Sequence, residues 1–223
     1  MGTLAGRRGR RDRAATEARI LRAVGQVLAR RGFRDLGINA IARQARLDKV
    51  LIYRYFGGLP GLLAAFGRQA EFWPPPAELV AANGATSARS DAVEWSTAVL
   101  KGLLRGLRAR PTTQEILRWE LAEGSPLTER LAAVREEQGL EMLGRMALGP
   151  ELEGGLDVPA LAAVLTAGIT YLVLLSKTAP AWLGVPLQDE HGWRRIESAI
   201  ETIVKRVMPS SRLDQVEPRG EKP

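Results

Sequence analysis

The chain has 223 residues and a formal net charge of +7, with 32 Lys and Arg, one histidine and no cysteine. The lack of cysteine excludes disulfides and thiolate metal sites, and the single histidine, His191, provides neither a zinc site nor a histidine-dependent catalytic triad. We therefore expect no metal, no cofactor and no enzymatic activity; an all-helical enzyme is the least favoured alternative.

The positive charge is concentrated at the start of the chain. Residues 1–56 hold 14 Lys and Arg against 4 Asp and Glu, whereas residues 57–223 hold 18 against 21. This division indicates a polyanionic partner for the N-terminal part alone. A basic helix on a membrane surface fits less well, because the bulky apolar residues are needed for a helical core. No apolar stretch follows the arginine-rich start, so we expect a cytoplasmic protein without a membrane partner.

A basic arm is predicted at residues 1–13, where Arg10 and Arg11 belong to the run RRGRRDR. An arginine-rich arm can lie along a DNA backbone or enter a minor groove, where Arg is favoured. A solvated tail without any DNA contact is the alternative. The position of the run directly before the first helix favours the DNA contact.

A DNA-binding domain of three helices is predicted at residues 14–58. The first helix covers about residues 14–31, and Gly32 is expected to end it. Phe33, just beyond, can fold back on the core. The apolar residues of this helix recur at helical spacing and should form its buried face: Ile20, Leu21, Val24, Val27 and Leu28.

The next two helices are predicted to be joined by a tight turn. The second helix covers about residues 38–45, and Asp48 is placed to cap the third, which should end at Gly57. Two short helices with a tight turn, the second rich in groups that reach phosphates, are typical of a helix-turn-helix. The candidate DNA-contacting side chains here are Arg46, Lys49, Val50, Leu51, Tyr53, Arg54 and Tyr55.

A larger helical domain is predicted for residues 59–208, because helical patterns follow one another without β-type alternation. Its first helix should run to about Phe72, before prolines break it, and the small polar stretch 81–90 should be a loop. The fold class is therefore all-α: a helix-turn-helix domain followed by a helical bundle for ligand binding and dimerisation. Further helices are expected at about 91–108, 112–123, 126–148, 157–180 and 190–208, before a disordered tail at 209–223.

The stretch 160–175 is almost wholly apolar. A transmembrane helix needs about 20 apolar residues; this run is shorter and is flanked by Asp157 and Lys177. A helix that is apolar all round is buried on every side, so we expect one face on its own core and the other on a second subunit. Paired with the last helix, it would form a four-helix dimer interface, for which the candidates are Leu165, Leu172, Ile196, Ile200 and Ile203.

An apolar ligand pocket is a further hypothesis for the larger domain. Such pockets are lined by aromatic and flexible side chains with few polar groups. Glu120 and Thr170 could supply polar contacts, or they could be solvated helix residues. Ordinary core packing is the alternative for each apolar candidate; these are Trp95, Trp119, Met142, Met146 and Tyr171.

Residues 18–66 resemble the DNA-binding domain of the TetR family of bacterial transcription regulators. The features that carry the resemblance lie at the family's spacing: GF at 32–33, IA at 41–42 and YRYF at 53–56. The resemblance implies a double-stranded DNA operator, dimerisation through the last two long helices, and a small-molecule effector that the sequence does not identify.

The resemblance also implies roles for single residues. Tyr53 and Tyr55 take the positions of two side chains that contact backbone phosphates in the family. The positions that face base edges, at the start of the third helix, are occupied by Lys49, Val50 and Leu51.

Four positions depart from the family's pattern. Gly37 replaces a phosphate-binding Thr, and Leu59 replaces a common lysine, so two backbone contacts are missing. Arg46 stands where the turn usually has glycine. Val50 replaces a small residue, and its contact with thymine methyls would give this chain an operator of its own.

We therefore predict a homodimeric, ligand-responsive transcription regulator on a palindromic operator, a repressor rather than an activator. A non-regulatory architectural DNA-binding protein is the alternative with the same basic N-terminus. Such a protein would not need a large acidic C-terminal part with an apolar interface.

Overall fold

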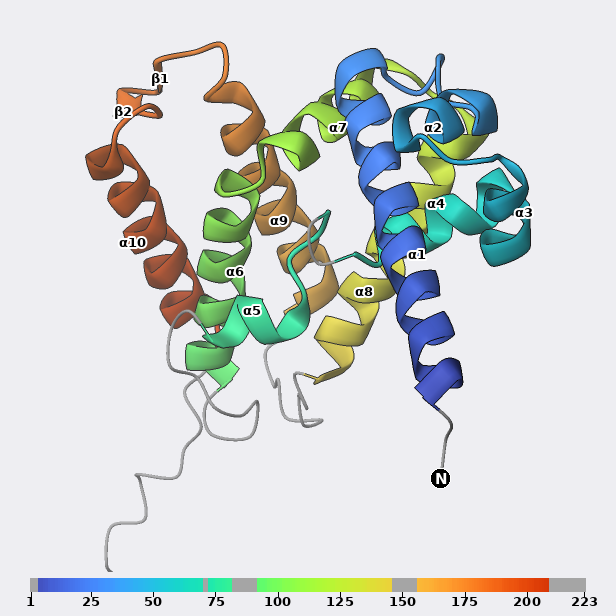
Figure 1. Ribbon diagram of the computed structural model, residues 1–223. Coiled ribbons are helices and arrows are strands. Elements are labelled where there is room, and N and C mark those ends of the chain that lie inside the picture. The colour runs from blue at the N-terminus through green and yellow to red at the C-terminus, as the bar shows by residue number, and fades with distance from the viewer. Residues whose placement is uncertain (1–3, 70–71, 82–91, 146–155, 209–223) are drawn as a thin grey trace, which may run out of the picture. The chain divides into compact units, whose positions relative to one another are not determined.

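The computed structural model describes residues 4–69, 72–81, 92–145 and 156–208, and within these ranges the chain is almost entirely helical (Figure 1). The predicted all-α fold class is confirmed. The described elements, in chain order, are α1 (Leu4–Arg31), α2 (Ile38–Ala45), α3 (Val50–Phe56), α4 (Leu59–Gly67), α5 (Pro76–Ala81), α6 (Ala92–Arg108), α7 (Pro111–Ala122), α8 (Pro126–Arg145), α9 (Val158–Leu175), β1 (Ala181–Trp182), β2 (Val185–Pro186) and α10 (Glu190–Val207).

The chain divides into two compact units, each made of two segments. The chain is cut at three places: just before α5, inside α6 and inside α8. None of these cuts lies directly after α3, where the predicted domain boundary lies. The DNA-binding helices therefore share their unit with α7 and most of α8. Unit 1 comprises Met1–Pro75 and Arg105–Glu141, and unit 2 comprises Pro76–Leu104 and Met142–Pro223.

The core of unit 1 is built around α1. The predicted buried face of this helix is confirmed, with Ile20, Val24 and Leu28 fully inaccessible to solvent. Ile41 from α2, Ile52 from α3, and residues of α4 and α7 pack against it. Burial of these aliphatic side chains is the main free-energy term that holds the three DNA-binding helices together.

The first helix is longer than the sequence analysis predicts. It begins at Leu4 instead of about residue 14, so most of the predicted arm is helical. One reason lies at the junction, where Arg13 and Glu17 are four residues apart and form an ion pair of 2.7 Å between Nε and Oε1. Such pairs stabilise a helix by a few tenths of a kcal/mol, about 0.2–0.5.

The fourth helix is shorter than predicted: it ends at Gly67 and does not reach Phe72. After Gly67 the chain turns back, so Phe72 is buried and its ring centroid lies 4.9 Å from that of Phe66. Prolines follow as expected, but Pro76 begins the short helix α5, which the sequence analysis did not predict. Predictions for 82–90, 146–150 and 209–223 lie outside the described residues.

Helix α7 is tied to the loop that follows α1. The Glu123 carboxylate accepts hydrogen bonds from the backbone N–H groups of Phe33 and Arg34, each at 3.1 Å. The Trp119 ring packs against Gly32, which has φ +70° and where a Cβ would lie 2.9 Å from ring atoms. Gly32 is therefore needed both for the end of α1 and for this close approach. At the other end of α7, Thr113 Oγ1 donates to the Phe72 carbonyl at 2.6 Å.

In unit 2, α9 and α10 start as predicted and are connected by a small hairpin. Asp157 and Asp189 cap them, each accepting a backbone N–H from the residue three positions on, at 2.9 and 2.8 Å. The prediction that α9 continues to Pro180 was wrong, because the helix ends at Leu175. Strands β1 and β2 follow, in antiparallel register with Trp182 opposite Val185.

Helix α9 is only partly covered by its own chain. Val158, Ile169, Val173 and Leu174 are buried, but Val164 is 69% exposed. By length and composition alone, this helix could also cross a membrane. The expectation that one of its faces packs on its own core is met, and the other face is apolar and open to solvent.

Candidate DNA-binding site

The turn between α2 and α3 is held by an arginine from α1. Arg46, in the turn, has a left-handed backbone (φ 51°, ψ 48°), the conformation for which glycine is favoured. Arg19 donates from Nε to the Ala45 carbonyl at 2.8 Å and from Nη2 to the Arg46 carbonyl at 2.6 Å. The planar guanidinium thus satisfies two carbonyls at the end of α2 and stabilises a turn that Arg46 makes costly.

The start of α3 is fixed by its predicted cap. Asp48 Oδ1 accepts a hydrogen bond from the Val50 N–H at 2.9 Å, as predicted, although Lys49 and not Asp48 holds the cap position of the helix. Lys49 is exposed and Val50 is 60% exposed, so both can meet a partner. Leu51, the third residue predicted to face base edges, is half-buried and packs against the core of unit 1.

Tyr53 and Arg54 are exposed on α3, whereas Tyr55 is half-buried. The Arg13 guanidinium lies over the Tyr55 ring, with Cζ 5.0 Å from the ring centroid. The pKa of Arg13 is raised, first by its hydrogen bond to the Glu17 carboxylate. Tyr55 is therefore shared between the core and a cation from α1, which is a different environment from that of the freely exposed Tyr53.

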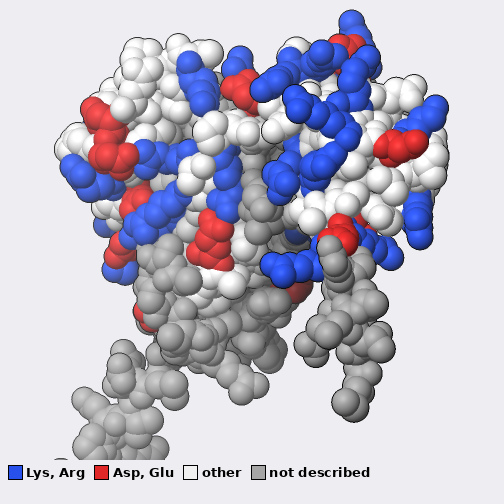
Figure 2. All heavy atoms as spheres, viewed as in Figure 1, with Lys and Arg blue, Asp and Glu red and all other residues white. Residues whose placement is uncertain are grey.

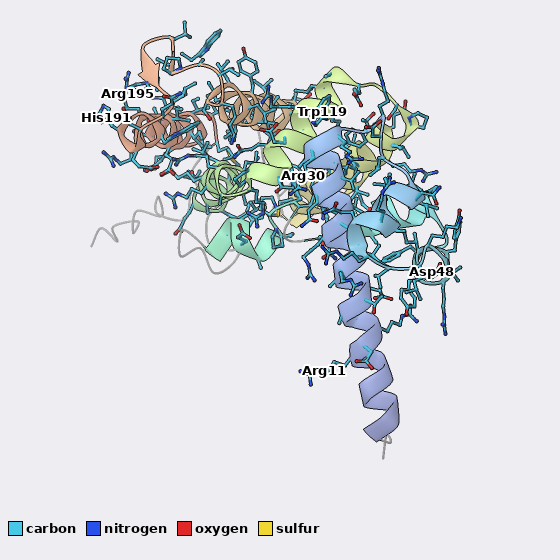
Figure 3. The ribbon with its side chains drawn as sticks, turned by 45° about the horizontal axis from the view of Figure 1, so that its top comes forward. Arg11, Arg30, Asp48, Trp119, His191 and Arg195 are labelled. Atoms are coloured by element: carbon cyan, nitrogen blue, oxygen red, sulfur yellow. The ribbon has the colours of Figure 1, made fainter. Side chains whose placement is uncertain are left out.

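The N-terminal turns of α1 project beyond α2, α3 and α4 in both ribbon views (Figures 1 and 3). Arg11 lies on this projecting part and is exposed, and Arg10 belongs to the same helix. Arg30 marks the opposite end of α1 in Figure 3. In the face shown by Figure 2, Lys and Arg predominate over α1 to α4, with isolated acidic side chains between them. A surface of this charge attracts a polyanion.

Two family phosphate positions carry no polar side chain here. Gly37 precedes α2 and makes no side-chain cap. Leu59, at the start of α4, is half-buried against the core of unit 1. Neither position can therefore offer a polar side chain to a DNA phosphate.

Sequence reasoning placed Arg13 in the predicted arm and overlooked that its spacing from Glu17 is a signal for helix. It also overlooked the role of Arg19 in the turn. The sequence pattern indicated only that Arg19 is one of several arginines on the outer face of the first helix. Nothing in the sequence distinguishes it from Arg22, since its role depends on carbonyls about 26 residues further along the chain.

The predicted pocket residues are divided between the two units. Trp95 and Met142 are buried in unit 2, but Trp119 belongs to unit 1, where it packs on Gly32. Tyr171 is 50% exposed and stacks edge-on with Trp182 at 6.0 Å, so its predicted inward position was wrong. Met146 lies outside the described residues.

Glu120 and Thr170, the two polar candidates for the pocket, both form hydrogen bonds within their own units. Glu120 forms a two-pronged ion pair with Arg135, one bond of which is 2.8 Å, and both side chains are largely buried. Arg135 also lies over the Trp73 ring at 5.7 Å. Thr170 donates a hydrogen bond from its hydroxyl to the Thr166 carbonyl at 2.8 Å, a bond within α9.

The hydroxyl of Thr97 on α6 is buried and has no hydrogen-bond partner among the described residues.

The predicted interface residues differ in their exposure. Leu165 and Leu172 on α9 and Ile196 on α10 are half-buried, and Ile203 is exposed. Ile200 is buried by its own chain and does not present its side chain to a partner, contrary to its predicted place.

Comparison with known proteins supports this description of the N-terminal helices. Residues 20–66 match the family described as bacterial regulatory proteins, TetR family. No curated protein sequence matches the chain.

Solved structures extend the likeness to most of the chain. A TetR-family transcription regulator from Marinobacter aquaeolei VT8 is 19% identical, with a TM-score of 0.59 over 88% of this chain and 97% of that one. A regulator of the family from Rhodococcus sp. is 20% identical, with a TM-score of 0.59 over 88% and 100%. The fatty acid degradation regulator FadR from Bacillus halodurans is 16% identical, with a TM-score of 0.55 over 84% and 96%. Residues 20–66 thus form a TetR-family helix-turn-helix domain, and the chain as a whole has the fold of the solved TetR-family regulators.

Proposed function

We propose that this protein is a transcription regulator that binds a double-stranded DNA operator with α3 in the major groove. One observation carries the proposal: a tight turn held by Arg19 leads into a short helix whose exposed side chains are Lys49, Val50, Tyr53 and Arg54. A helix of this kind fits the groove, while an anchored turn fixes its angle of entry.

The exposed residues of α3 divide into two roles. Lys49 and Val50, at the start of the helix, are proposed to read base edges: an ammonium suits guanine acceptors, and an aliphatic side chain suits a thymine methyl. Tyr53 and Arg54 are proposed to contact phosphates, which position the protein without reading sequence. Leu51 is left out of the base-reading set, because it packs on the core.

We further propose a cytoplasmic homodimer that pairs through α9 and α10 and represses transcription until a small effector binds in the helical domain. The open apolar face of α9 supports the dimer, since a contiguous exposed apolar surface marks an interaction site. Two-fold symmetry of the protein would then be mirrored in a palindromic operator.

Selection of bound sites from random DNA tests the proposal. We expect a palindrome whose half-sites are one helical turn apart, about 34 Å. Lys49→Ala, which changes an exposed side chain, should enrich a different base at one position of each half-site. Uniform coating of DNA without any enriched sequence would instead indicate an architectural protein and contradict the proposal.

A further inference from the structure

We infer that Arg13 is a phosphate ligand of the DNA-binding site, held in position by Glu17 and Tyr55. The inference rests on the proposed function, and it adds to the site a residue from the helical extension of α1. The proposed partner is the phosphodiester backbone next to the half-site that α3 reads.

The Arg13 guanidinium is held on two sides. Its Nε donates to Glu17 Oε1 at 2.7 Å, and its Cζ lies over the Tyr55 ring, 5.0 Å from the ring centroid. The two terminal amino groups make no hydrogen bond with the described residues, and 57% of the side chain is exposed. An arginine held in this way loses little conformational freedom on binding, and its outer edge can donate two parallel hydrogen bonds to one phosphate.

The place of Arg13 is next to the phosphate-contacting part of α3. Arg13 lies over Tyr55, which takes a position that the family resemblance assigns to a phosphate contact, and α1 continues past α3 in both ribbon views. A DNA backbone that reaches Tyr55 would therefore also meet the Arg13 guanidinium.

Arg13 would also replace a phosphate contact that the domain lacks at two other positions. The positions of Gly37 and Leu59 offer no polar side chain for phosphates. A guanidinium on α1 restores one charge-assisted backbone contact per half-site, and each such contact releases condensed counterions from DNA.

A structural role for Arg13 is the competing explanation. The side chain would then only fasten α1 to α3 through Tyr55, and DNA would not touch it. The two explanations differ in salt dependence, because only a phosphate contact changes the number of counterions released.

The experiment measures binding isotherms of the full chain on its selected operator at four salt concentrations. We expect Arg13→Gln to lower the slope of log affinity against log salt by about 2 per dimer, from roughly 0.9 per phosphate. Affinity at the lowest salt should fall about tenfold per copy. Arg30→Gln, which removes the same charge from the far end of α1, should change neither quantity.

Three outcomes would overturn the inference. They are an unchanged affinity of Arg13→Gln, a reduced affinity with an unchanged slope, and an equal effect of Arg30→Gln. Thermal unfolding of each variant shows whether the fold is retained, and Arg13→Lys, which keeps the charge, should restore the slope where Arg13→Gln lowers it. Failure of the unmodified protein to select any operator would contradict the proposed function instead.

Discussion

Helices α3 and α9 both expose side chains to solvent, but polar groups predominate on the first and apolar groups on the second. Apart from Val50, the exposed residues at and along α3 are Lys49, Tyr53 and Arg54, whose polar groups are well hydrated. The open face of α9 carries aliphatic side chains such as that of Val164, which gain free energy when they leave water. A hydrated surface suits a partner that comes and goes, whereas an apolar one suits a permanent partner. The chemistry of the exposed side chains thus distinguishes the proposed DNA surface from the proposed subunit surface.

The largest expected effect is the loss of the proposed dimer interface at α9. Val164→Glu should convert a dimer to a monomer, because an unpaired carboxylate would have to be buried in the interface. Since Val164 is exposed in the single chain, the fold should survive. Leu121→Glu, at an apolar position of α7 that is 79% exposed, is the control and should remain dimeric. Sedimentation measures both, and a dimeric Val164→Glu variant would exclude this part of α9 from the interface.

The second prediction concerns the turn that aims α3. Arg19→Met removes two hydrogen bonds to carbonyls, and we expect operator binding to weaken by about 1–3 kcal/mol while helix content is retained. Arg22→Met is the matched control, because Arg22 is an exposed arginine of the same helix. Equal losses in the two variants would mean that overall charge, and not the clamped turn, matters.

The third prediction separates reading from positioning on α3. Lys49→Ala should change the preferred base at one position of each half-site, at a cost of about 1–3 kcal/mol for the original base. Tyr53→Phe should weaken binding about equally on all sequences, because a phosphate contact carries no base information. Competition among single-base operator variants distinguishes the two. An unchanged preference in Lys49→Ala would refute the assigned role of α3.

The smallest expected effect concerns an ion pair within unit 2. Hydrogen bonds from Lys101 and Lys205 lower the pKa of Glu201 from 4.5 to about 2. Because the folded pKa is depressed, the stabilisation is present above pH 4.5 and is lost as the pH falls toward 2. Lys101→Met should therefore lower the melting temperature at pH 7 more than at pH 2.

Lys205→Met is the companion variant for this pair, since Lys205 lies one turn along α10 and is more exposed than Lys101. Its effect at pH 7 should be smaller than that of Lys101→Met. A loss that is the same at pH 7 and pH 2 would show that packing, and not charge, accounts for the Lys101 effect.

Local signals predicted α2, α3 and α10 well. Asp48 and Asp189 begin helices through hydrogen bonds to residues two or three positions away, so their effect is visible in the sequence. Gly57 likewise ends α3 with a positive φ. These short-range interactions place helix ends without knowledge of the fold.

The failures depend on contacts between distant residues. Tyr171 was assigned to the inward side of its helix by position, but it is 50% exposed beside Trp182. Glu120 was a candidate for a polar contact with a ligand, but its carboxylate forms an ion pair with Arg135, 15 residues further along the chain. Periodicity indicates whether a residue lies on the inward or the outward face of its helix, but it does not indicate which residues from other elements will contact it.

Arg46 has a consequence for how this protein can change in evolution. A left-handed arginine costs about 1 kcal/mol relative to glycine, so Arg46→Gly is a stabilising substitution that a single codon change can reach. The same change would remove a positive charge from the exposed turn directly before α3. Selection for a more heat-resistant protein and selection for a tighter hold on DNA would therefore act in opposite directions at this one position.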